Sequence, residues 1–141
     1  MDAAMSPDQH RRLVVDTEES RREYFLLFRK TMRRWIRGDL DTPGVESWRE
    51  FRRRVEGTAE RLRQSANGKT IAVFTSGGPS AAFAGYALGL DDLRTMELSW
   101  SISNASYTEL LASKTDEEER FTLLSFNAVP HLGDPELLTG A

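Results

Sequence analysis

The spacing of apolar residues divides the chain into a helical first part and a β-prone second part. Ser6 is placed to cap a short helix over residues 6–15. Asp16 then caps a longer helix, in which apolar residues recur at three- and four-residue spacing and predict a buried stripe. The stripe comprises Phe25, Phe28, Met32, Trp35 and Ile36. Gly38 and the loop at residues 41–44 end this helix.

The next helix has the clearest pattern in the chain. Ser47 and Glu50 form a capping box at its start, and Asn67-Gly68 ends it. One apolar face comprises Trp48, Phe51, Val55, Thr58, Ala59 and Leu62. The arginines off that face are expected in solvent: Arg49, Arg52, Arg53, Arg61 and Arg63. Glu50 stands four residues before Arg54, the favourable order for a helical ion pair.

The β-prone part begins with an apolar run at residues 70–75. Its length and lack of alternation predict a strand buried on both faces, as in a parallel sheet. The turn at residues 76–79 follows at once, and a small-residue helix over residues 80–88 ends at Gly89.

Two further stretches have strand patterns. Leu98, Trp100 and Ile102 alternate with polar residues, and the strand continues at residues 107–111 after a break. A last strand at residues 120–126 follows an acidic turn. Together these elements predict one α/β domain with a sheet buried by helices.

Composition limits the chemistry that the chain can perform. The 141 residues suit a single domain, and the absence of cysteine excludes disulfides, Cys-ligated metals and thiol nucleophiles. With only His10 and His131 as imidazoles, we expect no metal and no cofactor. The chain has no apolar run of the ~18 residues that a membrane span needs. Its first residues lack the features of a secretory signal, so a cytoplasmic protein is expected.

The charge is unevenly distributed along the chain. Residues 21–63 contain 13 basic and 7 acidic groups, whereas residues 64–141 contain 4 and 10. A solvated arginine-rich face is the simpler interpretation, because glutamates are interspersed and the net charge is -3. The alternative is an interaction module that binds protein or RNA through the helices of residues 21–63, although a nucleic-acid partner is the weaker expectation.

The most informative feature is the predicted strand–turn–helix at residues 70–88. Ser76, Gly77 and Gly78 stand where the strand ends and the helix begins. A helix N-terminus offers unpaired N–H groups to an anion, and glycines let a ligand approach the backbone closely. These three residues therefore form the candidate phosphate-binding site, although many glycine-containing turns bind nothing.

Several stretches together resemble the C-terminal half of the histidine phosphatase superfamily, the phosphoglycerate-mutase-like proteins. They are Glu46-Ser47-Trp48, Phe51, Arg54-Val55, residues 71–75, Ser76-Gly77-Gly78-Pro79, Asn104-Ala105-Ser106, Thr108, Phe126-Asn127 and His131-Leu132. The resemblance implies a three-layer α/β sandwich with a mostly parallel sheet. It also implies hydrolysis or transfer of phosphomonoesters through a phosphohistidine. Residues 46–132 would be the C-terminal half of that domain, preceded by a helical segment at 1–45 and followed by a tail at 133–141.

The chain departs from the family pattern at two places. The Arg-His-Gly motif of the nucleophile is missing, together with the fold's first strand and the helix after it. Ser76 stands where the family's second histidine is usual, and a serine hydroxyl carries no positive charge. We therefore expect a truncated or inactive phosphatase that would bind a phosphorylated small molecule only through Ser76, Gly77 and Gly78.

Two other interpretations follow from the same region. Ser76 after a strand resembles a nucleophile elbow with His131 as base, but Phe74 stands where that motif needs glycine. Without the first strand, the edge of the strand at residues 70–75 would be exposed, and exposed edges invite pairing. We therefore expect the chain either to dimerise, as a homo-oligomer, or to be poorly soluble.

Overall fold

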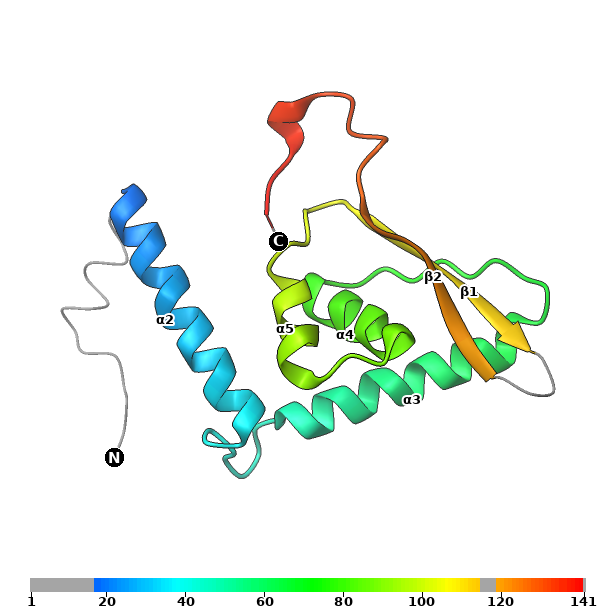
Figure 1. The fold of residues 1–141 in the computed structure, drawn as a ribbon, viewed down its shortest axis with the longest axis horizontal. Helices are drawn as coiled ribbons and strands as arrows, with labels where there is room; N and C mark the ends of the chain where they lie inside the picture. The colour runs from blue at the N-terminus through cyan, green and yellow to red at the C-terminus, as the bar shows by residue number, and fades with distance from the viewer. Residues whose placement is uncertain (1–16, 115–118, 141) are drawn as a thin grey trace.

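The computed structural model describes residues 17–114 and 119–140 (Figure 1). The predicted helix at 6–15, its neighbour Asp16 and His10 lie outside the described residues. The elements, in chain order, are α2 (Glu18–Arg37), α3 (Trp48–Ala66), α4 (Gly77–Leu88), α5 (Asp92–Ser99), β1 (Tyr107–Lys114), β2 (Glu119–Ala128) and a 3₁₀ turn, η1 (Pro135–Leu137). The described part is thus a mixed α/β fold.

Helix α2 is bounded by well-defined caps at both ends. The Thr17 hydroxyl accepts a hydrogen bond from the backbone N–H of Ser20 at 3.1 Å. In return, the backbone N–H of Thr17 donates to the Ser20 hydroxyl at 3.0 Å. Gly38 ends the helix in the left-handed conformation, with φ 81°, which favours glycine. The cap at Gly38 agrees with the sequence prediction.

The predicted buried stripe of α2 is only partly formed. Met32, Trp35 and Ile36 pack against the core. Phe25 and Phe28 are exposed, which contradicts the prediction. Figure 1 shows the reason, because the N-terminal end of α2 leans away from the other helices.

The hydrophobic core lies between α3, α4 and α5. Its buried members are Trp48, Phe51, Val55, Ala82 and Met96. Three aromatic rings join α2 to α3, because Trp35 lies 5.2 Å from Trp48 and 5.7 Å from Phe51 between ring centroids. The predicted apolar face of α3 is therefore confirmed at its buried positions, including Ala59.

The sheet consists of β1 and β2, paired antiparallel, with Leu110 opposite Leu123 and Ala112 opposite Phe121. Phe121 is buried, and its ring lies 5.0 Å from that of Phe83 on α4. The hairpin therefore packs on α4, as Figure 1 shows. Strands at residues 107–111 and 120–126 were expected, and both form within this hairpin.

Two strand predictions are wrong. Residues 70–75 form no strand and are exposed throughout, because no other described segment lies alongside to supply a hydrogen-bonding ladder. Leu98 belongs to α5, whose N-cap Asp91 accepts from the N–H of Arg94 at 2.8 Å. The cap and the helical turns outweigh the alternation of Leu98, Trp100 and Ile102. The mostly parallel three-layer sandwich stays a prediction.

Candidate functional site

Ser76 is the residue from which α4 begins. Its backbone is extended, with φ -98° and ψ 175°, and its side chain makes no capping hydrogen bond. The Ser76 carbonyl accepts from the N–H of Ser80 at 3.2 Å and from the Ser80 hydroxyl at 3.0 Å. The Ser76 hydroxyl is thus left to face solvent, since the residue is exposed.

Gly77 and Gly78 form the first turn of α4. Their N–H groups belong to the four that an α-helix leaves without an internal partner. A Cβ at Gly78 would lie 3.9 Å from the Phe51 ring, which is ordinary contact distance. Pro79 has no N–H to offer, so the donors of this turn are the Ser76 hydroxyl and the two glycine amides.

The electrostatics of this turn favour an anion weakly. The first turn of α4 contains no acidic residue, so an anion meets no like charge there. The positive end of the helix macrodipole adds to the two free amides. The turn itself supplies no cationic side chain, so the arrangement can hold a phosphate but cannot neutralise it.

The described contacts of His131 are with Tyr107 and do not include Ser76. Its ring is exposed and packs on Tyr107, with 6.1 Å between ring centroids. Within the described ranges no hydrogen bond joins His131 to Ser76. The serine hydrolase interpretation therefore finds no support in the geometry.

A polar cluster between α3 and α4 was not anticipated from the sequence. Glu60 accepts from Arg63 at 2.7 Å and from the Tyr86 hydroxyl at 2.6 Å. These bonds lower the pKa of Glu60, with the Arg63 hydrogen bond as the main cause. The hydrogen bond to Glu60 raises the pKa of Tyr86 to about 12.

The side chain of Arg63 is only 3% exposed, which contradicts its predicted place in solvent. Arg52 is a second arginine that is buried more than predicted. Its Nη1 donates to the Thr95 hydroxyl at 3.0 Å, and Nη2 lies 3.0 Å from Glu56. Arg52 joins α3 to α5, whereas Arg63 bonds to Glu60 of its own helix, and Glu60 in turn bonds to Tyr86 of α4. We therefore assign both arginines a structural role. Their only signal in sequence is that each lies at the border of the apolar face.

The predicted ion pair between Glu50 and Arg54 does not form. Arg54 pairs instead with Glu46, at 2.7 Å from Nε to Oε1. Glu50 is already engaged by the N–H and hydroxyl of Ser47, both at 2.8 Å. The confirmed capping box therefore displaces the expected ion pair.

Asn127, one of the residues in the family resemblance, has a structural role. Its amide oxygen accepts from the N–H of Ser103 at 2.7 Å, and its amide nitrogen donates to the Ser101 carbonyl at 2.6 Å. Its φ of 54° lies in the left-handed region, which asparagine tolerates better than most residues. Asn127 thus anchors the end of β2 to the segment before β1.

The described residues offer neither a metal-binding cluster nor a helix that could cross a membrane. Across residues 17–114 and 119–140, no group of three or more acidic or histidine side chains gathers as a metal site requires. None of the described helices combines the length and the apolar character needed to cross a bilayer.

The α/β fold and the glycine turn at a helix N-terminus are features shared by many phosphate-binding domains. The family model of the histidine phosphatase superfamily (branch 1) matches residues 16–128, and the chain therefore belongs to this superfamily. No curated protein and no solved structure matches the chain significantly.

Proposed function

We propose that this chain contains the C-terminal part of a histidine-phosphatase-like site. In this proposal it binds the phosphate of a small phosphomonoester at the start of α4. The observation that carries the proposal is the exposed Ser76 hydroxyl, free of any capping bond, beside the unpaired amides of Gly77 and Gly78. The family match over residues 16–128 supports a phosphorylated substrate class.

The same residues imply how phosphate would be held. The Ser76 hydroxyl donates one hydrogen bond, and the amides of Gly77 and Gly78 donate two more to phosphoryl oxygens. The dipole of α4 adds a small favourable term, typically 0.3–1 kcal/mol at an exposed helix end. Without a nearby cation, binding is expected to be weak.

The chain is further proposed to perform no phosphohistidine transfer by itself. The Arg-His-Gly motif is absent from the sequence, and His131 contacts Tyr107 rather than the turn at Ser76. Phosphoryl transfer depends on positioning and on stabilising developing charge. A hydroxyl and two amides can position the group but provide no nucleophile of the family type.

Phosphate binding is tested by titrating the chain with inorganic phosphate and following backbone amide shifts by NMR. The largest shifts are expected at Gly77 and Gly78, with severalfold weaker binding in Ser76→Ala. Ser65→Ala removes an exposed hydroxyl at the far end of α3 and should leave binding unchanged. Equal affinities for the wild type and Ser76→Ala would contradict the site.

Catalysis is tested separately with p-nitrophenyl phosphate. We expect the wild type to hydrolyse it no faster than Ser76→Ala does. Turnover that the wild type shows and Ser76→Ala loses would contradict the proposed inactivity. That result would leave the phosphate site itself in place.

A second candidate function rests on the basic face of α2. Arg29, Lys30, Arg33, Arg34 and Arg37 line an open hollow together with Leu26. In the described part of the chain, no carboxylate forms an ion pair with Lys30, Arg33, Arg34 or Arg37. We propose that this face binds an acidic segment of a partner protein.

Retention of the protein on an anionic column distinguishes binding by the basic face of α2 from a general effect of net charge. The double variant Arg33→Glu/Arg37→Glu should elute from heparin at much lower salt than the wild type. Arg49→Glu/Arg53→Glu makes the same charge change on α3 and should elute later than the α2 variant. Identical elution of the two variants would show that net charge alone governs retention.

A further inference from the structure

The segment between α3 and α4 combines strand chemistry with an unpaired backbone. Residues 70–75 read Thr-Ile-Ala-Val-Phe-Thr, with four β-branched residues and no charge, glycine or proline. Val73 is 57% exposed and Phe74 is 97% exposed. Apolar side chains of this size are rarely left in solvent together along one extended stretch.

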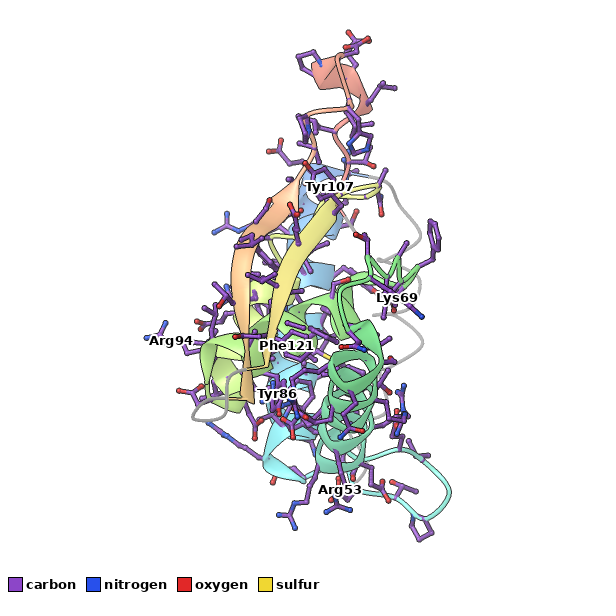
Figure 2. The ribbon with its side chains drawn as sticks, turned by 90° about the vertical axis from the view of Figure 1, so that its right-hand side faces the viewer. Arg53, Lys69, Tyr86, Arg94, Tyr107 and Phe121 are labelled. Atoms are coloured by element: carbon purple, nitrogen blue, oxygen red, sulfur yellow. The ribbon has the colours of Figure 1, made fainter. Side chains whose placement is uncertain are left out.

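The backbone of this segment is equally without partners. No backbone hydrogen bond joins residues 70–75 to any other described segment. Figure 1 shows the segment running from the end of α3 to α4 and crossing the hairpin in this view, while the described sheet consists of β1 and β2 paired with each other. Figure 2 shows Lys69, which precedes it, at the outer edge of the molecule. The segment therefore presents an open strand edge.

We propose that residues 70–75 of two copies of this chain pair as antiparallel strands about a two-fold axis at Val73. Six residues match the usual length of a strand in globular proteins. Pairing would satisfy backbone groups that the single chain leaves to water and would cover the apolar side chains. Interfaces between identical chains most often have such two-fold symmetry.

The symmetry fixes which residues face each other. A two-fold axis perpendicular to the paired strands and to the sheet they form keeps each side chain on the same face in both copies. Opposed residues therefore lie at equal distances before and after the residue on the axis. With Val73 on the axis, Ile71 faces Thr75, and Ala72 faces Phe74. One face then consists of β-branched side chains, while on the other the large Phe74 ring lies over the small Ala72.

The charge pattern supports this orientation over a parallel one. Lys69 is the only charged residue adjoining the segment on its N-terminal side, and residues 70–80 contain no charge. Antiparallel pairing places the two Lys69 side chains at opposite ends. A parallel, in-register pair would place them side by side, which is unfavourable. Because the paired surface is small, we expect a weak, concentration-dependent dimer.

The absence of cysteine allows the register to be tested with single thiols. Directly opposed residues have Cα atoms about 4.5–5.5 Å apart, within the range that a disulfide spans. Val73→Cys should form a covalent dimer under mild oxidation, whereas Ile71→Cys and Thr75→Cys should do so only when mixed. Val45→Cys, at 60% exposure in the loop before α3, is the matched control and should stay monomeric.

Sedimentation of the thiol-free chain provides the second measurement. The wild type should show a rising dimer fraction with concentration, and Val73→Lys should abolish it by opposing two like charges. Val45→Lys should sediment as the wild type does. Circular dichroism checks that each variant is folded. A wild type that stays monomeric at every concentration, or cross-linking at Val45 equal to that at Val73, would overturn the proposal.

Discussion

Arg63 illustrates that the position of a residue in a helical pattern does not by itself determine whether its side chain is buried. The residue lies at the border of the apolar face of α3, where either solvent or a neighbouring helix can be met. The Arg63 guanidinium can be buried because it donates a hydrogen bond to the Glu60 carboxylate. The Tyr86 hydroxyl donates to the same carboxylate. The apolar spacing predicts the face correctly, and the carboxylate of Glu60 lies three residues before Arg63 on the same helix, but the burial of this pair depends on where α4 lies.

The Tyr86–Glu60 bond predicts how stability changes with pH. The folded-state pKa of Tyr86, about 12, is above its ordinary value of 10, so the stabilisation is present below pH 10 and is lost as pH rises toward 12. Glu60 has a lowered pKa, so its contribution is lost instead as pH falls through the acidic range. Tyr86→Phe should flatten the alkaline loss, as measured by urea unfolding between about pH 9 and 12. An unchanged alkaline slope in that variant would contradict the role of this bond.

Gly85 provides a prediction about packing. A Cβ there would clash with the Thr95 hydroxyl, since the two atoms would lie closer together than real side chains do. Gly85→Ala should therefore lower the free energy of unfolding by ~1–3 kcal/mol by forcing α4 and α5 apart.

Gly57→Ala is the matched control for this change. The nearest atom to a Cβ at Gly57 is the end of the Arg61 side chain at 3.7 Å, so space is available. Alanine is the better helix former and should raise stability by ~0.5–1 kcal/mol. Loss of stability in both variants by the same amount would argue against close packing at Gly85.

At the level of whole elements, local signals determine which predictions are confirmed. The start of α3 and the strands at residues 107–111 and 120–126 depend on residues a few positions apart, and these are correctly predicted. The antiparallel pairing of the two strands is not part of the prediction. The segment at residues 70–75 needs neighbouring strands, which the described chain does not supply, so its apolar composition alone is insufficient. At α5 the Asp91 cap outweighs the alternation because a cap satisfies backbone donors directly.

The Ser47 capping box is expected to be the main local determinant of α3. The N–H of Glu50 donates to the Ser47 hydroxyl at 3.3 Å, while the Glu50 carboxylate accepts from both groups of Ser47. Ser47→Ala should cost ~1 kcal/mol in thermal or urea unfolding. Ser101→Ala removes a hydroxyl that donates only to the Leu98 carbonyl at the end of α5, without a capping box, and should have a smaller effect.

Across the whole molecule, stability is expected to be concentrated in one layer. The buried side chains belong mainly to α3, α4 and α5. Helix α2 packs on the core through Met32, Trp35 and Ile36 near its C-terminal end, and through contacts of Phe25 and Arg29 with Trp100. Hydrogen exchange should therefore be slowest in α3 and α4 and fast in the N-terminal turns of α2. Comparable protection along the full length of α2 would contradict this distribution.

The candidate site could be predicted from the sequence only where it depends on residues that are close together in the chain. The presence of a helix ending at Gly89 could be predicted from adjacent residues, but α4 begins at Gly77 rather than at the predicted Ser80, so the glycines lie in its first turn. The lack of contact between His131 and Ser76 could not be predicted from adjacent residues, because it depends on the path of the chain after β2. Asn127 shows this most clearly, since its side chain binds residues more than twenty positions away.

The exposed segment at residues 70–75 also determines how the chain would behave toward proteases. Proteases bind their substrates in an extended conformation, and Phe74 presents an accessible aromatic side chain of the type that chymotrypsin prefers. Brief digestion should cut first after Phe74, separating the two halves of the chain at the join between α3 and α4. Cleavage should slow as the protein concentration rises, because paired strands shield the peptide bond that a single chain leaves open.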